Sequence, residues 1–251
     1  MSRVLLVLWV VATWGCVSAE PDDGGLRSDA GISRDDAAAG SPDAGEPLTC
    51  EAPEAHSGEG TYYDADGSGN CSFPASVEDL RVAAMNQADY AGSRACGACV
   101  DVEGPMGRVQ VRIVDRCPEC APGDIDLSPS AFDMIAERSL GRVPIRWTYV
   151  PCEVEGPLVY HFKDGSNPFW TAVQVRNHRH RIARFEYRNA DGAFVEAERA
   201  EYNFFVEPAG MGEGPFTFRV TDIYGDTVTD TGIPLRDDDS EAGAGQFPEC
   251  E

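Results

Sequence analysis

Two aspartates are the residues of this sequence best suited to catalysis. Asp115 ends a run of alternating apolar and polar residues, and Asp126 lies just ahead of a segment with the pattern of a helix start. Two carboxylates on either side of a glycosidic bond are the minimum for most sugar hydrolysis. A simpler interpretation stands beside it, because an aspartate at a strand end or before a helix also binds backbone amides.

The cysteines offer a second kind of chemistry, either metal binding or disulfide formation. Cys96-Gly-Ala-Cys99 and Cys117-Pro-Glu-Cys120 are separated by 17 residues and have the spacing of a four-cysteine zinc site. Zinc would leave four further cysteines over, and an exported chain meets oxidising conditions in which thiols pair. We therefore predict disulfides, no metal and no cofactor.

The first residues have the features of an export signal. Arg3 precedes an apolar run, residues 4–12, that is too short to span a bilayer as a mature helix, so residues 1–19 are predicted to be a signal peptide. Cleavage before Cys16 would give a lipoprotein anchored through that cysteine, and cleavage after Ala19 a freely secreted protein. The location is accordingly extracellular, or the cell surface or outer membrane as a lipoprotein.

Charge and composition limit the classes of molecule that this protein can bind. The chain has 43 acidic and 20 basic residues and a net charge of −23, so phosphate backbones and anionic lipid heads would repel it. We expect no nucleic-acid partner, membrane contact only through a lipid anchor, and a monomer. Residues 20–47 are an acidic linker with too few apolar side chains to order themselves.

The elements that must position the aspartates are mainly strands. Residues 109–114 and 143–149 alternate with the period of half-buried strands, and Trp147 in the second run is expected in the core. One helix is predicted, with Ser128 as N-cap and Pro129 at its first position.

After residue 157 the pattern changes to short strands separated by Gly, Asn and Asp turns, which suggests a sandwich. The Gly156-Pro157 pair marks the boundary. We predict a first domain at 48–153, a second at 156–236 and an acidic tail at 237–251.

Five strings in order across this boundary resemble the expansins, especially the bacterial expansin-like proteins. They are Gly60-Thr-Tyr-Tyr63, Cys96-Gly-Ala-Cys99, Val114-Asp115-Arg-Cys-Pro118, Asp126-Leu-Ser-Pro-Ser-Ala-Phe132 and Val173-Gln-Val-Arg-Asn-His178. The resemblance implies an all-β fold: a six-stranded double-psi β-barrel related to family-45 glycoside hydrolases, then an immunoglobulin-like sandwich that acts as a family-63 carbohydrate-binding module. It also implies a protein that is not an enzyme and that binds and loosens wall polysaccharide: cellulose, hemicellulose or a similar glycan.

The resemblance assigns site residues to both domains. In the barrel groove Thr61, Asp115 and Asp126 match the family, with Asp126 at the position of the hydrolases' general acid and Tyr63 as a groove aromatic. The glycan-binding residues of the sandwich would be Lys163, Phe169, Trp170 and Tyr202. Bacterial members with few cysteines have a tyrosine two residues beyond the first aspartate, where this chain has Cys117.

Cysteine pairing in plant and fungal relatives implies Cys71 with Cys96 and Cys99 with Cys152. Cys117 and Cys120 would then close a local loop, and Cys50 and Cys250 are left as the last pair.

Two enzymatic alternatives remain open. A family-45-like endoglucanase needs a base just after the Thr-x-Tyr motif, but that position is Ala65, and Asp64 lies one residue early on the wrong face of a strand. A lytic transglycosylase acting on peptidoglycan needs only one acidic residue, because a hydroxyl of the sugar itself is the nucleophile. The acidity of both domains leads us to expect a neutral glycan rather than an acidic one such as pectin.

Overall fold

The computed structural model describes residues 54–76 and 78–250. The predicted signal peptide at 1–19, the linker at 20–47, the lipidation of Cys16 and the pairing of Cys50 lie outside the described residues. Within the part that is described, no helix is both long enough and apolar enough to cross a membrane.

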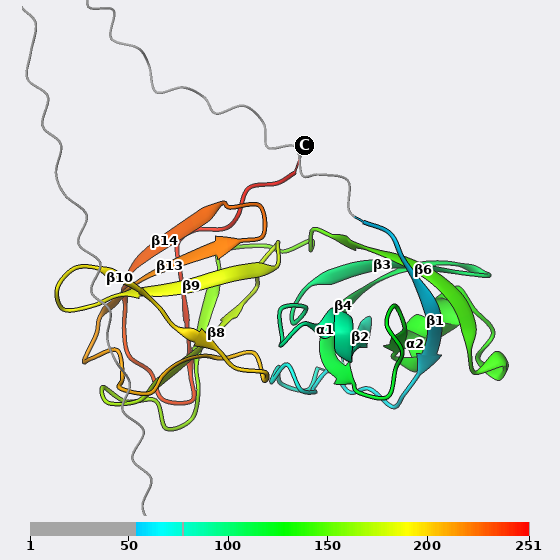
Figure 1. The fold of residues 1–251 in the computed structure, drawn as a ribbon, viewed down its shortest axis with the longest axis horizontal. Coiled ribbons are helices and arrows are strands. Elements are labelled where there is room, and N and C mark those ends of the chain that lie inside the picture. The colour runs from blue at the N-terminus through cyan, green and yellow to red at the C-terminus, as the bar shows by residue number, and fades with distance from the viewer. Residues whose placement is uncertain (1–53, 77, 251) are drawn as a thin grey trace, which may run out of the picture. The chain divides into compact units, whose positions relative to one another are not determined.

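The first domain is a closed six-stranded barrel with the strand order β1-β5-β2-β4-β3-β6, so the predicted double-psi barrel is confirmed (Figure 1). Parallel pairs join β1 to β5 and β2 to β4, and the remaining pairs are antiparallel. The strands are β1 (His56–Tyr62), β2 (Val82–Asn86), β3 (Cys99–Gly104), β4 (Gly107–Cys117), β5 (Ile125–Leu127) and β6 (Val143–Val150).

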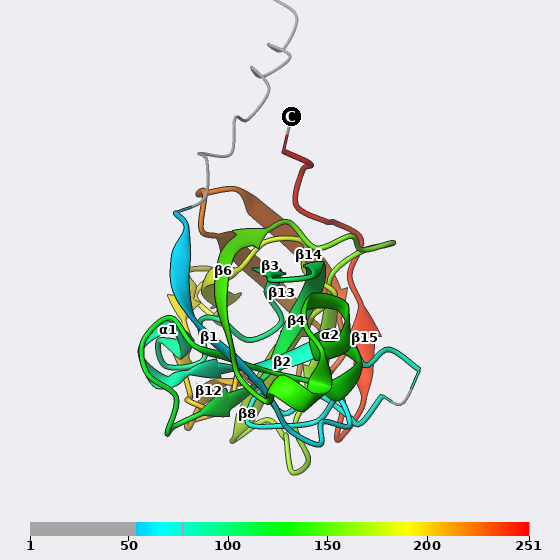
Figure 2. The ribbon, with the colours of Figure 1, turned by 90° about the vertical axis from the view of Figure 1, so that its right-hand side faces the viewer.

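Three short helices lie beside the barrel: α1 (Gln87–Tyr90), α2 (Pro129–Ile135) and the 3-10 helix η1 (Arg138–Leu140). The predicted start of α2 is confirmed, since the Ser128 side chain accepts from the amide of Ala131 and Pro129 opens the helix. The buried side of α2, with Phe132 and Ile135, packs on the barrel beside β4 (Figure 2).

Trp147 is buried in the barrel core, as predicted. Its ring stacks on His56 with centroids 3.9 Å apart, and its indole N–H donates to the carbonyl of Gly123 at 2.8 Å. Gly123 crosses Gly58 so closely that a Cβ on Gly58 would lie 2.3 Å from the Gly123 carbonyl carbon. This close crossing brings the chain that leads into β5 against the start of β1.

The second domain is a β-sandwich of a four-stranded sheet, β10-β9-β13-β14, and a five-stranded sheet, β11-β12-β8-β7-β15. The strands are β7 (Val159–Phe162), β8 (Thr171–Arg176), β9 (Ile182–Arg188), β10 (Phe194–Glu196), β11 (Glu198–Arg199), β12 (Phe205–Glu207), β13 (Phe216–Asp222), β14 (Thr227–Ile233) and β15 (Ser240–Ala242). Aromatic side chains of both sheets, among them Phe162 of β7 and Phe218 of β13, fill the space between them.

The sandwich extends beyond its predicted end at 236. β15 pairs with β7, and Phe247 is 1% exposed and packs in the sandwich core. The predicted acidic tail at 237–251 is therefore wrong over these residues. The physical reason is that β15 is an edge strand, which needs few apolar side chains, and a single aromatic beyond it anchors the segment.

Three of the predicted disulfides are confirmed: Cys71–Cys96, Cys99–Cys152 and Cys117–Cys120. The four cysteines with zinc spacing are thereby all used in disulfides. Cys250 is also disulfide-bonded, and its predicted partner, Cys50, lies outside the described residues.

Removal of Cys99–Cys152 should destabilise the fold more than removal of Cys117–Cys120. The first bond spans 53 residues and the second spans 3, and loop-closure entropy gives contributions of about 4 and about 1.5 kcal/mol, respectively. We expect the Cys99→Ser/Cys152→Ser protein to show the larger drop in the free energy of urea unfolding. Equal losses for the two double variants would contradict this ranking.

Candidate functional site

The barrel brings the three predicted groove residues into one row across neighbouring strands. Thr61 of β1 pairs with Asp126 of β5, and Ala84 of β2 pairs with Asp126 on one side and Asp115 of β4 on the other. Directly paired residues of a sheet point to the same face, so the carboxylates are separated by two strand spacings, roughly 10 Å between backbones. A bulge between Ala83 and Ala84 in the β2–β4 register brings Asp115 into this row.

The surroundings of Asp126 raise the pKa of its carboxyl group. Burial raises the pKa of its carboxyl above the ordinary value, and the negative charges of Glu119 and Asp115 act in the same direction. The Thr61 hydroxyl donates to Oδ1 of Asp126 at 2.5 Å, and this hydrogen bond, together with the charge of Arg142, opposes the rise in pKa. The surroundings of Asp126 therefore favour its protonated form.

Asp115 makes contacts of a different kind. Its Oδ1 accepts the backbone N–H of Asn70 at 2.6 Å and that of Arg116 at 2.8 Å. Among the described residues, Oδ2 accepts no hydrogen bond. One oxygen of Asp115 therefore binds backbone amides, which is the structural role that the sequence allows beside catalysis.

Tyr63 lies just beyond β1 and is half-buried rather than fully exposed. Its hydroxyl is buried without a hydrogen-bond partner in the described structure. Burial raises its pKa, and the negative charges of Asp115, Asp126 and Asp66 act in the same direction. The structure thus brings Thr61, Tyr63, Asp115 and Asp126 together.

The sandwich residues gather along its five-stranded sheet. Lys163 follows β7, and Phe169 and Trp170 precede β8, so antiparallel pairing places these three at the same end of the sheet. Phe169 is 79% exposed and Trp170 is half-buried. Tyr202, in the turn between β11 and β12, lies toward the opposite end, because β12 runs antiparallel to β8.

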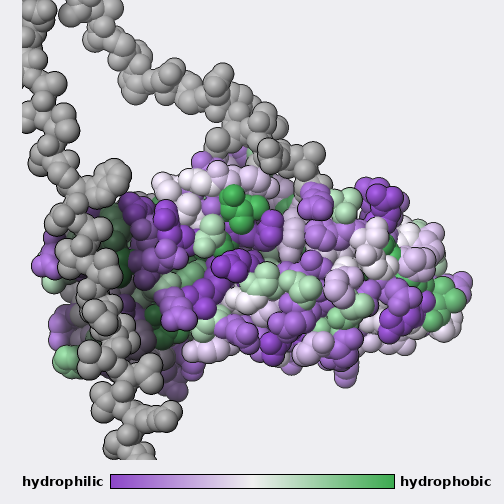
Figure 3. All heavy atoms as spheres, viewed as in Figure 1, coloured by the Kyte–Doolittle hydropathy of each residue, from purple (hydrophilic) through white to green (hydrophobic). Residues whose placement is uncertain are grey.

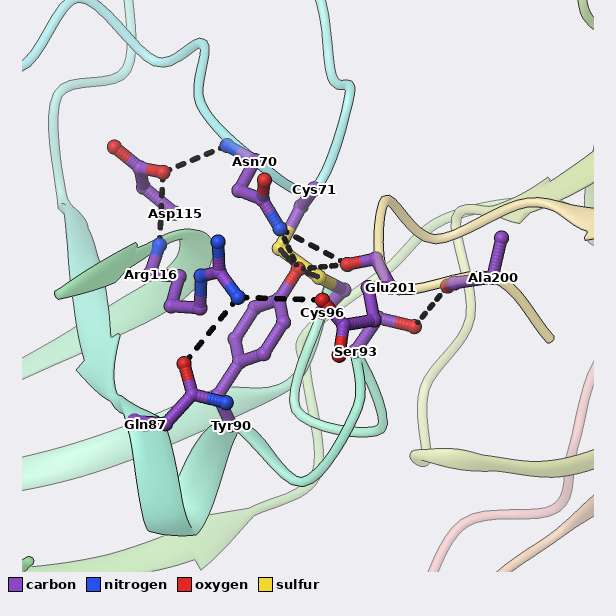
Figure 4. Close-up of polar contacts among 10 residues, drawn as sticks. All are labelled: Asn70, Cys71, Gln87, Tyr90, Ser93, Cys96, Asp115, Arg116, Ala200 and Glu201. Atoms are coloured by element: carbon purple, nitrogen blue, oxygen red, sulfur yellow. Dashed lines mark hydrogen bonds and ion pairs between the residues drawn. A yellow bond between two sulfur atoms is a disulfide. The ribbon is translucent and has the colours of Figure 1, made fainter. Parts of the chain in front are cut away.

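The turn that carries Tyr202 contacts the barrel. The backbone carbonyl of Glu201 accepts from the Asn70 side chain at 2.9 Å and from the Tyr90 hydroxyl at 2.7 Å, and the Glu201 carboxylate pairs with Arg116 at 3.4 Å (Figure 4). Asn70 and Arg116 are the residues that also bind Asp115. These contacts place the Tyr202 turn beside the barrel groove, at the end of the sheet away from Trp170.

Several residues around the site were not assigned from the sequence. Asn70 follows Gly69 in an irregular loop, where the sequence indicates only a turn. Glu119, on the loop closed by Cys117–Cys120, and Arg142 affect the pKa of Asp126. Ala84 has no polar group and could be recognised only from the pairing of its strand.

A separate cavity of about 420 Å³ contains none of the predicted groove or glycan-binding residues. It is lined by Arg81, Arg112 and His178, among others.

Among the described residues, no group of three or more His, Cys, Asp or Glu side chains could hold a metal ion. On the face shown in Figure 3, hydrophilic residues predominate outside the area covered by grey atoms.

Known proteins are similar to both domains. The family described as "Lytic transglycolase" matches residues 57–147. Expansin-YoaJ of Bacillus subtilis is 36% identical over 220 residues, which is 80% of this chain and 94% of that protein. Expansin-like protein 2 of Dictyostelium discoideum is 32% identical over 68% of this chain and 45% of its own length.

Two solved structures are similar to the whole described fold. The apo expansin of Clavibacter michiganensis has 32% identity and a TM-score of 0.72, and covers 78% of this chain and 100% of its own. A mutant of that expansin in complex with cellohexaose gives 30% identity, the same TM-score and the same coverage.

The carboxyl group of Asp126 should titrate above its ordinary pKa of 3.8. Thr61→Val should raise this pKa further, because the hydrogen bond to the charged form is lost. Carbon-13 NMR titration of the carboxyl resonance measures both values. The folded state holds this proton to higher pH than the unfolded state, so the contribution of Asp126 to the free energy of unfolding should fall as pH rises from 3.8 through the folded pKa. A folded pKa at or below 3.8 would contradict the assignment.

Proposed function

From the membership of this chain in the expansin family, which its relatives show, we propose that it binds cell-wall polysaccharide and loosens it without hydrolysis. The preferred glycan is cellulose or a similar neutral polymer. Cellohexaose is bound by the mutant Clavibacter expansin, and that complex supports a glucan as the ligand of this chain as well.

The observation that carries the non-hydrolytic part of the proposal is the absence of a base opposite Asp126. Ala65, at the expected base position, is 8% exposed and packs in the barrel core. Asp64 is exposed and lies beyond the end of β1. Asp115 has one carboxylate oxygen occupied by two amides. An inverting hydrolase needs an acid and a base on opposite sides of the bond, and in the described part of the chain neither Ala65 nor Asp64 supplies that base beside Asp126.

The sandwich supplies affinity in this proposal. Aromatic rings bind the C–H faces of pyranoses with a large contact area and little loss of conformational entropy. Phe169, Trp170 and Tyr202 follow the five-stranded sheet toward the barrel groove, with Lys163 at the outer end. The net charge of −23 opposes binding to acidic pectin and favours a neutral glycan.

The proposal places the protein outside the cytoplasm. The three disulfides between described cysteines fit an oxidising compartment. Either a free secreted protein or a lipoprotein anchored at Cys16 would meet wall glycan there.

A second candidate is lytic transglycosylase activity on peptidoglycan. It is favoured by the match of residues 57–147 to the lytic transglycolase family and by the single acid, Asp126, with its raised pKa. Release of anhydro-muropeptides from purified sacculi by the wild-type protein would select this function in place of the first.

Asp126→Asn should abolish the weakening of filter paper and leave cellulose binding nearly unchanged. The substitution keeps the size and the acceptor for Thr61 but removes the proton or charge that acts on the glucan. Tensile tests and pull-down assays measure the two effects, with Asp191→Asn, an exposed turn residue, as the matched control. Reducing sugar should stay at background for all three proteins. Sugar release by the wild type that Asp126→Asn lacks would instead make this chain a hydrolase.

Trp170→Ala should weaken cellulose binding by a few-fold to tenfold, since loss of a stacking aromatic costs about 0.5 to 1.5 kcal/mol beyond the lost area. Phe169→Ala should act in the same way. Tyr224→Ala is the aromatic control, because Tyr224 is similarly exposed to Tyr202 but lies between β13 and β14 of the other sheet. Binding isotherms on insoluble cellulose measure the effect, and a loss for Tyr224→Ala equal to that for Trp170→Ala would refute the assignment of the strip.

A further inference from the structure

Asp115 acts through a loop rather than through chemistry at the glycan. We propose that Asp115 is a positioning residue: it holds the barrel loop 69–71 in the conformation that fixes the Tyr202 turn of the sandwich beside the groove. Barrel and sandwich then bind one glycan chain in a fixed alignment. This role rests on the proposed function, and it deepens that proposal by separating the tasks of the two groove aspartates.

The first step is the packing of the loop on Asp115. The Asn70 amide donates to the Asp115 side chain at 2.6 Å. The Cys71 amide donates to the backbone carbonyl of Val114, the residue before Asp115, at 3.0 Å. A Cβ on Gly69 would lie 2.4 Å from both Cβ and Cγ of Asp115. The loop therefore lies directly against this side chain, and the Cys71–Cys96 disulfide ties its far end to the barrel.

Residues 70 and 71 of the loop also make hydrogen bonds with the sandwich. The Asn70 side chain donates to the Glu201 carbonyl and to the Tyr90 hydroxyl, which donates to the same carbonyl (Figure 4). On the other side of Tyr202, the Asn203 side chain donates to the Cys71 carbonyl at 3.3 Å. Both neighbours of Tyr202 in the sequence are thus bound by residues 70 and 71, whose conformation Asp115 sets.

Further hydrogen bonds confirm that this junction is a built contact. Ser93 donates through its hydroxyl to the Ala200 carbonyl and accepts from Arg199 through its own carbonyl. Gln174 of β8, which is fully buried, donates to the Cys71 carbonyl at 2.7 Å. Buried donors and acceptors that lose their partners are costly, so the junction has one favoured geometry.

The consequence for binding follows from effective concentration. When two binding surfaces are held in line, a long glycan that occupies one is presented to the other, and the affinity exceeds that of either surface alone. A ligand that fits only the sandwich gains nothing from the alignment. Disruption of the loop should therefore weaken binding of long chains selectively.

The experiment compares cellotetraose with hydroxyethyl cellulose, a soluble neutral polymer, by calorimetry. Asn70→Ala and Asp115→Ala should each lower affinity for the polymer by about fivefold to tenfold and change that for cellotetraose by less than about twofold. Tyr90→Phe, which keeps the buried ring, should have the same selectivity. Asn189→Ala is the matched control, because the described hydrogen bonds of this side chain stay within its own sandwich turn, and it should bind both ligands as wild type does.

Asp115→Asn separates positioning from charge. The asparagine Oδ1 can still accept both amides, so this variant should retain most of the polymer affinity that Asp115→Ala loses. Equal losses for Asp115→Asn and Asp115→Ala would overturn the proposal, because charge rather than loop binding would then be required. Unchanged polymer binding by Asn70→Ala would also overturn it.

A measurement without ligand keeps this test independent of the proposed function. Nitrogen-15 relaxation of the free protein should show that barrel and sandwich tumble together in the wild type and in Asp115→Asn, and more independently in Asn70→Ala and Asp115→Ala. If no glycan is bound, the proposed function fails while the relaxation data still decide the positioning role. Rigid tumbling in all variants would refute that role.

Discussion

Closure of the barrel is the constraint on which the site depends. β1 pairs with β5 on one edge and with β6 on the other, so no strand can shift its register without breaking two ladders. That register sets Thr61 beside Asp126 and leaves Ala84 between the two aspartates. A small apolar residue at the centre of the row separates the carboxylates, and each then takes its properties from its own surroundings.

Those surroundings give the two aspartates different properties. Asp126 is partly desolvated, faces Glu119 as a like charge and has a single neutral donor in Thr61, so its neutral form is favoured. Oδ1 of Asp115 accepts two backbone amides, which ties this side chain to the loop at Asn70. A pair of carboxylates in a groove is thus not sufficient for hydrolysis, because the partners of each decide whether it is available for proton transfer.

The sequence identified the chemistry better than the elements that frame it. The helix start at Ser128 followed from capping chemistry, and the candidate groove residues and three disulfides followed from the resemblance to expansins. An alternation of apolar residues could not predict β14, because Asp230 occupies an inward position in it. That carboxylate accepts from the Tyr160 hydroxyl and the Ala244 amide, so a buried polar network replaces the expected apolar residue.

Asn70 could not be predicted for a related reason. Its role depends on contacts with residues 20 and 131 positions away, and no local pattern records such contacts. Under the proposed function, the same long-range contacts would let a two-domain chain act as one binding surface. A flexible linker alone would let the sandwich hold glycan at any angle to the groove. Hydrogen bonds to the Glu201 carbonyl and from the Asn203 side chain, on the two sides of Tyr202, limit that freedom. The energy of aromatic stacking could then be directed at the groove that holds Asp126.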